Sequence, residues 1–508
     1  MSNADKLNIS PLDEHNRTLI DNVHPAEWTN PEPEPRYNLV AIGAGAAGLI
    51  STAGAAGLGG KAALIERHLL GGDCLNVGCV PSKALIRAAR AYADVRDAGE
   101  YGVDVPPGTT VNFSRVMERM RELRARIAPN DSAKRYTEMG VDVFLGDATF
   151  TGPDTLEVGG KTIRFSKAVI TTGARAWAPD IPGLADAGYL TNETLFNLTE
   201  CPKRLAIIGA GPIGCEMAQS FARFGTEVTI FEAGDHVLSR EDEDAARVVQ
   251  KAMEKDGIRL CTKSMVASIS HTDTDKTVTY SSPEGVRSVT VDEILVGVGR
   301  QPNVDGLGLE AAGVEYDTRN GVVVNDFLQT SNARIYAAGD ICSRFKFTHT
   351  ADAMARIVIG NALFKGRARV SALTVPWSTY TDPEIAHVGL YEKEAKEQGH
   401  DVTTFTQPFE DVDRAILEGE DEGFVKVHVK SGTDQILGAT MVGRHAGDMI
   451  NEITLAMTNG LGMSAIAKTI HPYPTTAEAI KRTGDAYNRT RLTPFVANLM
   501  EKWLRLIR

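Results

Sequence analysis

The hydrophobic pattern of the chain predicts strands that alternate with helices from Tyr37 onward. Short apolar runs bounded by polar or glycine-rich turns are typical of buried strands, and such runs occur at residues 39–42, 168–170, 205–208 and 293–296. Strands that alternate with helices favour parallel sheets covered by helices on both faces. We therefore expect an α/β fold for most of the chain.

An internal repeat is the most informative part of this pattern. The segment 39–48 (LVAIGAGAAG) recurs as 205–214 (LAIIGAGPIG), and at the same offset two apolar strands follow that end at Glu66 and Glu232. Each copy reads as a strand, a Gly-rich turn, a helix and a second strand closed by glutamate. This order is that of a Rossmann-like βαβ unit, and it predicts two such domains.

The Gly-x-Gly-x-x-Gly pattern predicts a dinucleotide site in each copy. The first glycine permits a tight turn, the second lets the backbone approach a pyrophosphate, and the third lets the helix pack closely on the strand. The glycines are Gly43, Gly45 and Gly48 in the first copy and Gly209, Gly211 and Gly214 in the second. A glycine-rich turn without a ligand is the bland alternative. Two copies predict two dinucleotides, most simply FAD and a nicotinamide nucleotide.

Glu232 bears on which nicotinamide nucleotide binds. A carboxylate that closes the second strand accepts hydrogen bonds from a ribose 2′-hydroxyl and repels a 2′-phosphate. We therefore expect NADH in preference to NADPH. Arg240 lies nearby in sequence and acts against this preference.

Two cysteines follow the first repeat in the run 71–83 (GGDCLNVGCVPSK). Cys74 and Cys79 lie on one face if the segment is helical or nearly so, and close contact then permits a disulfide. A position near a helix N-terminus, with Lys83 close by, lowers a thiol pKa, and a thiolate attacks disulfides or binds soft metals. Two structural cysteines are the alternative. A zinc site lacks further paired Cys or clustered His, so we expect no metal site.

At these residues the chain resembles the disulfide oxidoreductase flavoproteins, the family of lipoamide dehydrogenase, glutathione reductase and mercuric reductase. The resemblance covers about residues 37–480. It implies that Cys79 is the thiolate that contacts the flavin and that Cys74 is the thiol that exchanges with substrate. It places Lys83 near the flavin N5 with Glu216 as its ion-pair partner. It also implies a homodimer in which the partner subunit's C-terminal domain completes each active site.

Other motifs of the family occur in the same order. The resemblance assigns the following residues to the FAD and nicotinamide sites: Glu66, Ala148, Thr172, Gly173, Asp340, Thr348 and His349, together with Gly299 at the start of the loop that closes the nicotinamide domain. Asp73 departs from the family, where Thr is usual. Its carboxylate either raises the pKa of Cys74 or serves as a local base.

The late motif also departs from the family pattern. Disulfide reductases of the family carry a His before Pro, with Glu five residues beyond, and the His acts as acid–base catalyst. The run 471–478 (HPYPTTAE) instead puts Tyr473 in that position, displaces His471 by two residues and keeps Glu478. Tyrosine there resembles mercuric reductase, although the terminal Cys pair and the N-terminal Cys-x-x-Cys domain usual in those enzymes are missing. It stays open whether His471 or Tyr473 handles protons.

Composition and charge limit the classes of function. A chain of 508 residues with a net charge of −12 favours several domains and argues against nucleic-acid binding. No apolar run approaches the roughly 20 residues of a membrane span. The polar N-terminus lacks a signal pattern, and six cysteines are no disulfide scaffold. We expect a cytoplasmic protein without a transmembrane segment.

The expected domains follow the sequence. They are a polar N-terminal extension (1–36) that ends in an extended, proline-rich tether, the first part of the FAD-binding domain (37–195), the NAD(P)-binding domain (196–322), the second part of the FAD-binding domain (323–370), an α+β dimer-interface domain (371–484) and a basic amphipathic tail (485–508).

The leading hypothesis is an NAD(P)H-dependent FAD enzyme that passes electrons through the Cys74–Cys79 disulfide to a small, thiol-reactive acceptor. That acceptor is Hg(II) or a small disulfide. Enzymatic alternatives are a lipoamide dehydrogenase-like or glutathione reductase-like enzyme, or a quinone reductase in which the flavin reacts directly. A flavoprotein that binds a membrane or an acidic partner through its basic tail is the non-enzymatic alternative.

Overall fold

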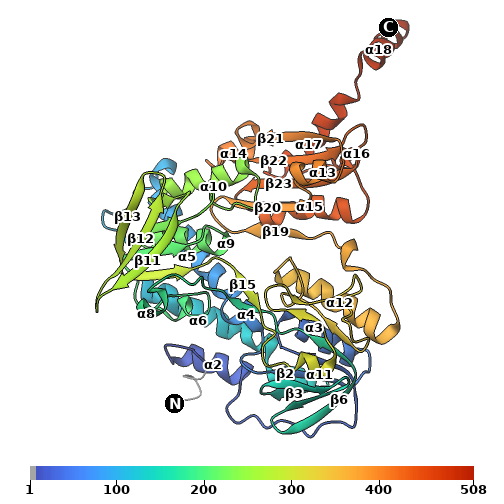
Figure 1. Ribbon diagram of the computed structural model, residues 1–508. Coiled ribbons are helices and arrows are strands. Elements are labelled where there is room, and N and C mark those ends of the chain that lie inside the picture. The colour runs from blue at the N-terminus through green and yellow to red at the C-terminus, as the bar shows by residue number, and fades with distance from the viewer. Residues whose placement is uncertain (1–6) are drawn as a thin grey trace. The chain divides into compact units, whose positions relative to one another are not determined.

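The computed structural model describes residues 7–508, and their elements can be followed along the colour bar of Figure 1. The chain divides into two compact units. The N-terminal unit comprises the residues up to Ala233 together with Arg259–Leu373, and the C-terminal unit comprises Gly234–Ile258 together with Thr374–Arg508.

The first βαβ repeat builds a mixed sheet in the N-terminal unit. Its strands are β1 (Tyr37–Ile42), β2 (Ala62–Glu66), β3 (Val141–Leu145), β4 (Ala148–Gly152), β5 (Thr155–Val158), β6 (Lys161–Ile170) and β18 (Ile335–Ala337). The order is β3-β2-β1-β6-β5-β4, and β18 also pairs with β6. The pairs among β3, β2, β1, β6 and β18 are parallel, whereas β4 and β5 add an antiparallel extension.

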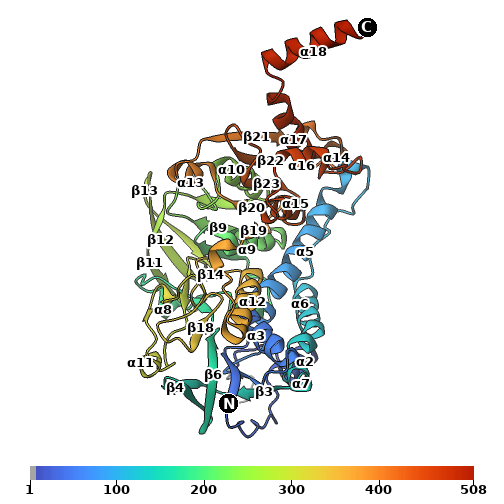
Figure 2. The same cartoon turned by 90° about the vertical axis from the view of Figure 1, so that its right-hand side faces the viewer.

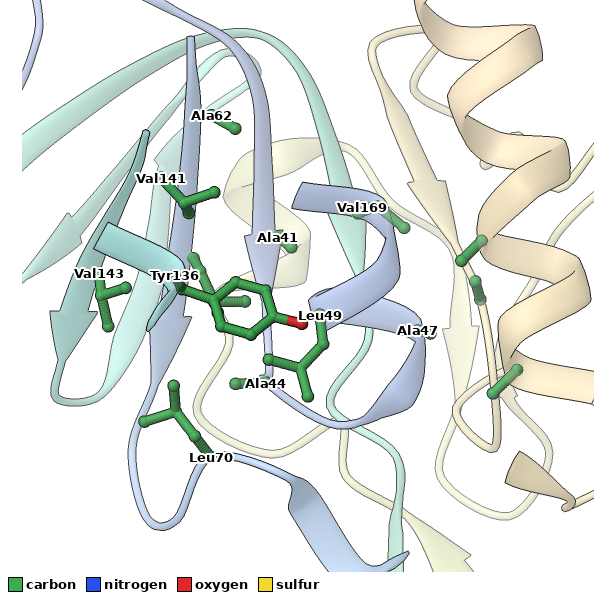
Figure 3. Close-up of a cluster of buried hydrophobic side chains, with 14 of the residues drawn as sticks. Ala41, Ala44, Ala47, Leu49, Ala62, Leu70, Tyr136, Val141, Val143 and Val169 are labelled. Atoms are coloured by element: carbon green, nitrogen blue, oxygen red, sulfur yellow. The ribbon is translucent and has the colours of Figure 1, made fainter. Parts of the chain in front are cut away.

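Helices flank this sheet and carry the redox motif. They are α2 (Glu14–Val23), α3 (Ala46–Gly57), α4 (Gly72–Asn76), α5 (Cys79–Arg96), α6 (Phe113–Ile127), α7 (Ala133–Glu138) and α12 (Thr348–Phe364). Successive residues of β1 fall in different core clusters, because neighbouring side chains of a strand point to opposite faces. Ala41 belongs to one cluster and Val40 to the other. Figure 3 shows the first cluster, in which Ala41 lies near Leu49 of α3 and the ring of Tyr136.

The second βαβ repeat forms a separate parallel sheet in the same unit. Its strands are β8 (Arg204–Ile208), β9 (Glu227–Phe231), β10 (Arg259–Cys261) and β14 (Glu293–Val296), in the order β10-β9-β8-β14, with α9 (Pro212–Arg223) after β8. An antiparallel sheet of β11 (Met265–His271), β12 (Lys276–Ser282) and β13 (Gly285–Val291) adjoins it in sequence. The remaining elements of the unit are β7 (Ala174–Ala176), α8 (Leu184–Ala187), β15 (Arg300–Pro302), α11 (Leu309–Ala312), β16 (Tyr316–Asp317) and β17 (Gly321–Val322). The two Rossmann-like folds predicted from the repeat are confirmed.

The C-terminal unit is an antiparallel sheet covered by helices. Its strands are β19 (Pro376–Thr379), β20 (Glu384–Gly389), β21 (Val402–Pro408), β22 (Phe424–Lys430) and β23 (Ile436–Gly443), in the order β19-β20-β23-β22-β21. Its helices are α10 (Glu243–Lys255), α13 (Glu392–Glu397), α14 (Asp413–Leu417), α15 (Ala446–Thr458), α16 (Met463–Lys468), α17 (Glu478–Thr490) and α18 (Pro494–Leu506). The expected C-terminal α+β fold is therefore confirmed.

Residues 234–258 follow β9 in sequence but pack in the C-terminal unit. Glu241 accepts hydrogen bonds there from Trp377 Nε1 at 3.0 Å and from the Tyr391 hydroxyl at 2.5 Å. Lys426 Nζ lies 2.6 Å from Asp242 Oδ2. A buried polar network thus ties the loop before α10 to the C-terminal sheet, and it excludes water from these charges.

The N-terminal extension packs against the N-terminal unit ahead of its proline run. Helix α2 buries Leu19, Ile20 and Val23, and Figure 2 shows it beside α6 and α7. Beyond α2, Asn30 exchanges two hydrogen bonds with the main chain of Leu145, at 2.7 and 2.9 Å. The Trp28 indole donates to the Val143 carbonyl at 3.1 Å. Apolar burial and strand-like contacts therefore hold the extension along the edge strand β3.

Candidate functional site

The glycines of the first repeat have three distinct environments. Gly43 has a φ of +102°, and a Cβ there would lie 2.5 Å from the Thr171 carbonyl oxygen. A Cβ on Gly48 would lie 1.9 Å from the Gly43 carbonyl oxygen, so only glycine lets α3 approach β1 this closely. Gly45 has nothing within 4 Å of that position. The turn is thus closely packed at Gly43 and Gly48. It is free of neighbouring atoms at Gly45, where a pyrophosphate would approach the start of α3.

The second repeat has the same arrangement. A Cβ on Gly209 would lie 2.9 Å from the Gly297 carbonyl oxygen, and one on Gly214 would lie 2.1 Å from the Gly209 carbonyl oxygen. The nearest atom to a Cβ on Gly211 is 3.9 Å away. Both predicted turns therefore have the shape that a dinucleotide pyrophosphate requires.

The closing glutamates brace these turns. Glu66 accepts hydrogen bonds from the Ala44 and His68 amides, each at 2.7 Å, and Glu232 accepts one from the Ala210 amide at 2.9 Å. Burial raises the pKa of Glu66, and the amide hydrogen bonds oppose this rise. A carboxylate has further lone pairs, so each glutamate can still accept from a ribose hydroxyl. The two carboxylate acceptors therefore suit two dinucleotides.

Cys74 and Cys79 lie at a break between two helices. Helix α4 ends at Asn76 and α5 begins at Cys79, so the segment is not one continuous helix. Both cysteines are free thiols in this structure, and their sulfur groups are hydrogen-bonded to one another. The two side chains therefore come together as predicted, with Cys79 at a helix N-terminus.

The two thiols differ in acidity. The hydrogen bond from Cys74, a second from Thr348 and the charge of Lys83 lower the pKa of Cys79 to about 6, although burial acts against them. The same shared hydrogen bond, together with burial, raises the pKa of Cys74. The pair therefore shares one proton at neutral pH, and Cys79 carries the negative charge. The Thr348 hydroxyl lies 3.5 Å from Cys79 Sγ.

Lys83 and Glu216 form the predicted ion pair. Lys83 Nζ lies 3.0 Å from Glu216 Oε2, and the Glu216 side chain is 6% exposed. Lys83 is one turn beyond Cys79 in α5, while Glu216 projects from α9 of the second repeat. The pair fixes the ammonium group near Cys79, where its charge stabilises the thiolate.

Asp73 does not act on Cys74 as expected. Its carboxylate contacts the Arg300 guanidinium, which also donates to the Ala174 carbonyl and lies 3.6 Å from Asp340 Oδ2. Asp131 is instead the carboxylate whose charge contributes to the raised pKa of Cys74. Burial raises the pKa of Asp131 itself. The ion pair with Arg300 makes Asp73 a poor candidate for a local base.

The predicted Thr172–Ala174 turn and the loop after Gly299 meet. Strand β7 pairs with β15, and Asn303 donates to the Thr172 carbonyl at 2.9 Å. The Thr172 hydroxyl in turn donates to the Asn303 carbonyl at 2.9 Å, and the Asn303 amide donates to the Gly173 carbonyl at 3.0 Å. These contacts join two motifs that are about 130 residues apart in sequence.

Three further predicted FAD residues have definite places in the N-terminal unit. Ala148 opens β4, and Asp340 follows β18 directly. Burial raises the pKa of Asp340, while Arg300 and Lys346 oppose that shift. His349 follows Thr348 at the start of α12 and stacks on Phe347, with ring centroids 5.3 Å apart. Arg300 Nε is buried near Asp340 without a hydrogen-bond partner in the described chain, as suits a donor awaiting an acidic ligand.

The late motif, residues 471–478, lies in the C-terminal unit. Its two candidate proton carriers, His471 and Tyr473, have different surroundings. His471 Nε2 lies 3.0 Å from the Glu452 carboxylate, and its side chain is 5% exposed. Tyr473 is exposed, and its hydroxyl donates to Asp413 at 2.7 Å, which raises its pKa. Glu478 Oε1 pairs with Arg482, whereas its buried Oε2 has no hydrogen-bond partner within residues 7–508. Tyr473 is therefore the more accessible of the two.

Sequence reasoning missed three charged residues around the redox segment. Arg300 and Asp131 are described above. Arg124 of α6 is 2% exposed and donates to the Asn76 carbonyl at 2.6 Å and to Asn16 Oδ1 at 2.7 Å. Burial lowers the pKa of Arg124 to about 10. No local spacing marks such residues, although Asn16 lies on the buried face of α2.

Residues 7–508 contain neither a metal-binding cluster nor a membrane-spanning helix. No group of three or more His, Cys, Asp or Glu side chains has an arrangement suited to a metal ion. No helix in this range has both the length and the apolar character that crossing a membrane requires.

Comparisons with known proteins agree with this arrangement. A family profile described as pyridine nucleotide-disulphide oxidoreductase matches residues 37–355, and the dimerisation domain of the same family matches residues 375–483. The match to the dimerisation domain supports a homodimer.

Relatives of known activity include two kinds of enzyme. A mercuric reductase of Lysinibacillus sphaericus is 36% identical over 449 residues, which cover 88% of this chain and 82% of that protein. A dihydrolipoyl dehydrogenase of Bacillus subtilis (strain 168) is 34% identical over 463 residues, which cover 87% of this chain and 96% of that protein. At this identity the two kinds of relative leave the acceptor undecided.

Solved structures give the same family. The HOCl-induced flavoprotein disulfide reductase RclA from Escherichia coli superposes with a TM-score of 0.79 at 31% identity, covering 88% of this chain and 99% of that one. Its Cu(II) complex matches with the same TM-score at 30% identity, covering 89% of this chain and 100% of that one. The chain belongs to the pyridine nucleotide-disulphide oxidoreductases, a family of FAD-dependent enzymes that use a reduced nicotinamide nucleotide.

Proposed function

We propose that this protein uses NADH to reduce a small, thiol-reactive acceptor through a redox-active pair formed by Cys74 and Cys79. The observation that carries the proposal is that Cys79 begins α5 within reach of Cys74 and Thr348, one turn from the Lys83–Glu216 ion pair. Gly45, Glu66, Ala148 and Asp340 would hold the FAD. When bound, FAD accepts a hydride from the nicotinamide and passes the electron pair to a neighbouring disulfide.

The redox step balances within the cysteine pair. Opening of a Cys74–Cys79 disulfide consumes two electrons and one proton, and it leaves a Cys74 thiol and a Cys79 thiolate. Lys83 and the Thr348 hydroxyl stabilise the negative charge on Cys79. Glu216 holds Lys83 in place and limits how far its charge lowers the pKa of the thiolate.

Cys74 then exchanges with the acceptor. After losing its proton, it attacks one sulfur of a small disulfide, and the other sulfur leaves and takes up a proton. The Cys79 thiolate next attacks Cys74, which re-forms the disulfide and releases the second thiol. With Hg(II) as acceptor, the two sulfurs would instead supply soft thiolate ligands to the metal ion.

Tyr473 would handle the acceptor in place of the histidine of disulfide reductases. Its hydroxyl is accessible, whereas His471 is held by Glu452. In the homodimer, Tyr473 of the partner subunit and Glu478 of the partner subunit would complete the site. A tyrosine is a weak acid at neutral pH, which favours an acceptor that needs little help from a general acid, such as a soft metal ion.

NADH is favoured over NADPH by the second repeat. Glu232 accepts a hydrogen bond from the Ala210 amide and would also accept one from the ribose 2′-hydroxyl. Its negative charge would repel a 2′-phosphate. Arg240 lies nearby in sequence and is exposed. The relevant measurement is the ratio of kcat/KM for the two nucleotides.

The test is a turnover screen of the FAD-loaded enzyme with NADH and with NADPH against Hg(II), Cu(II), oxidised glutathione, lipoamide and quinones. Anaerobic NADH should produce a long-wavelength charge-transfer band, and Cys79→Ser should abolish it. Cys201→Ser is the matched control, because Cys201 forms a hydrogen bond with Thr226 and is not part of the Cys74–Cys79 pair. A parent-like band in Cys79→Ser would contradict the proposal.

A quinone reductase is the second candidate. Quinone turnover that survives Cys74→Ala, without turnover of Hg(II) or disulfides, would favour this function.

A further inference from the structure

Helix α18 has an apolar face that packs on nothing in the described chain. Its 13 residues include none that is buried. Phe495 is 78% exposed, Trp503 60% and Leu506 79%. By contrast, the preceding helix α17 buries Ala479, Ile480, Thr483 and Gly484. Burial therefore ends within α17, and all residues from Asn488 to Phe495 are exposed.

Apolar and charged residues of α18 are sorted onto opposite sides. Successive residues of a helix turn by about 100°. At that spacing Phe495, Leu499, Trp503 and Leu506 share one side, flanked by Val496, Met500, Leu504 and Ile507. The other side carries Asn498, Glu501 and Arg505, while Lys502 lies at the edge of the apolar side, next to Phe495 and Leu506. A helix of this pattern is suited to lie in a polar–apolar boundary.

The charge of the helix opposes that of the protein as a whole. The chain carries a net charge of −12, but the residues from Lys502 to Arg508 contribute only positive side chains. The ion pair of Arg505 with Glu501 lies within the helix. Cations that flank an exposed aromatic and aliphatic face match the surface of an anionic bilayer, where headgroups attract the cations and acyl chains take the apolar side.

The helix is defined locally and is short. Thr493 caps it by accepting a hydrogen bond from the Val496 amide at 3.3 Å, and Pro494 occupies its first turn. Helices of about 12–15 residues are marginal in water when they bury no side chains. An apolar surface is therefore what would stabilise α18.

We propose that α18 lies on an anionic membrane surface through Phe495, Leu499, Trp503 and Leu506 and anchors the enzyme there. It does not cross the bilayer, because its length and charge suit the interface only. The anchor is independent of the acceptor and of the cysteine pair.

The experiment is co-sedimentation of the full-length, FAD-loaded protein with vesicles. Phosphatidylcholine vesicles with about 30% phosphatidylglycerol should bind at least about tenfold more protein than phosphatidylcholine alone, and added salt should reduce the bound fraction. The double variant Leu499→Glu/Trp503→Glu should lose binding to both. Met265→Glu/Val286→Glu changes two exposed apolar residues of the N-terminal unit and should bind like the parent.

Two outcomes would overturn the proposal. One is equal binding of the parent and the α18 variant to the anionic vesicles, including no binding by either. The other is a smaller oligomer for the α18 variant than for the parent in sedimentation without vesicles. That result would mean that the apolar face docks on a second copy of the chain. NADH oxidation by the variant in solution checks that the remaining fold is intact.

Discussion

Lys83 Nζ lies 3.0 Å from Glu216 Oε2, and this contact sets two opposing charges beside Cys79. Lys83 lowers the pKa of the Cys79 thiol, whereas Glu216 raises it. The two residues therefore form an ion pair with each other and have opposite effects on the same thiolate.

Substitutions in this pair should move the pKa of Cys79 in opposite directions. Lys83→Met should raise it by about one pH unit, and Glu216→Gln should lower it, because each removes one of the two charges. The measurement is the pH dependence of Cys79 alkylation in the reduced enzyme, followed by peptide mass spectrometry. Lys134→Met, on an 84% exposed side chain, should leave the curve in place. Shifts in the same direction for both variants would refute the electrostatic account.

Alanine substitutions at two glycines of the first turn should have different effects, one on the stability of the fold and the other on FAD affinity. Gly48→Ala should destabilise the fold by about 2–3 kcal/mol or more, because the new methyl overlaps the Gly43 carbonyl oxygen. Gly45→Ala meets no protein atom and should leave the melting temperature of the FAD-free protein unchanged. Its FAD affinity should still fall at least about tenfold, since the methyl occupies the approach of the pyrophosphate. Thermal melts and FAD titration separate the two effects, and normal FAD binding by Gly45→Ala would contradict the assignment.

Arg124 should matter for stability although it is far from the redox motif in sequence. Arg124→Met leaves the Asn76 carbonyl and the Asn16 side chain without their donor, and we expect a loss of about 2–4 kcal/mol in the free energy of unfolding. Arg126→Met, exposed on the same helix, should change it by less than about 0.5 kcal/mol. Urea denaturation of both variants measures the difference. Equal losses would show that the hydrogen bonds of Arg124 are not responsible.

His387 should make the C-terminal unit sensitive to acid. It is fully buried, stacks on Tyr391 and has a pKa lowered by burial from 6.5 to about 3. Below pH 6.5 the unfolded chain takes up a proton that the folded unit refuses until about pH 3. Stability is therefore complete above pH 6.5 and falls toward pH 3, by at most about 1.4 kcal/mol per pH unit.

His387→Gln removes this titration and retains a side chain that can hydrogen-bond Thr440. The difference in unfolding free energy between parent and variant should shrink or reverse as the pH is lowered from 7 to about 4. Urea unfolding monitored by the fluorescence of Trp377, whose ring lies 4.6 Å from His387, measures it. A difference that does not vary with pH would exclude His387 as the titrating group.

Features carried by a local motif were predictable from the sequence. The two Gly-rich turns and the proximity of Cys74 to Cys79 each depend on residues at fixed spacing, whereas the Lys83–Glu216 pair spans 133 positions and followed only from the family resemblance. Such spacing determines the backbone geometry of the turns directly, because the first and third glycine of each turn lie against a nearby carbonyl oxygen.

The residues that sequence reasoning missed act over long separations. Arg300 reaches Asp73 across 227 positions, and Arg124 meets Asn16 across 108. Charged residues are common, and no periodicity marks which of them becomes buried. The helix α2 did carry a local signal, since Asp13 caps it and Leu19, Ile20 and Val23 lie on one side. Its polar composition and the following prolines obscured that signal.

The N-terminal extension has a consequence for how the protein behaves in concentrated solution. An uncovered outer strand offers unpaired amide and carbonyl groups to any neighbouring chain, which is a common start of aggregation. Asn30 and Trp28 occupy such groups on β3. A shortened chain that begins at Tyr37 would keep the residues of both nucleotide turns and of the cysteine pair, yet it would lose the bond of Asn16 to Arg124 and present a bare sheet edge. Such a chain should aggregate more readily than the parent.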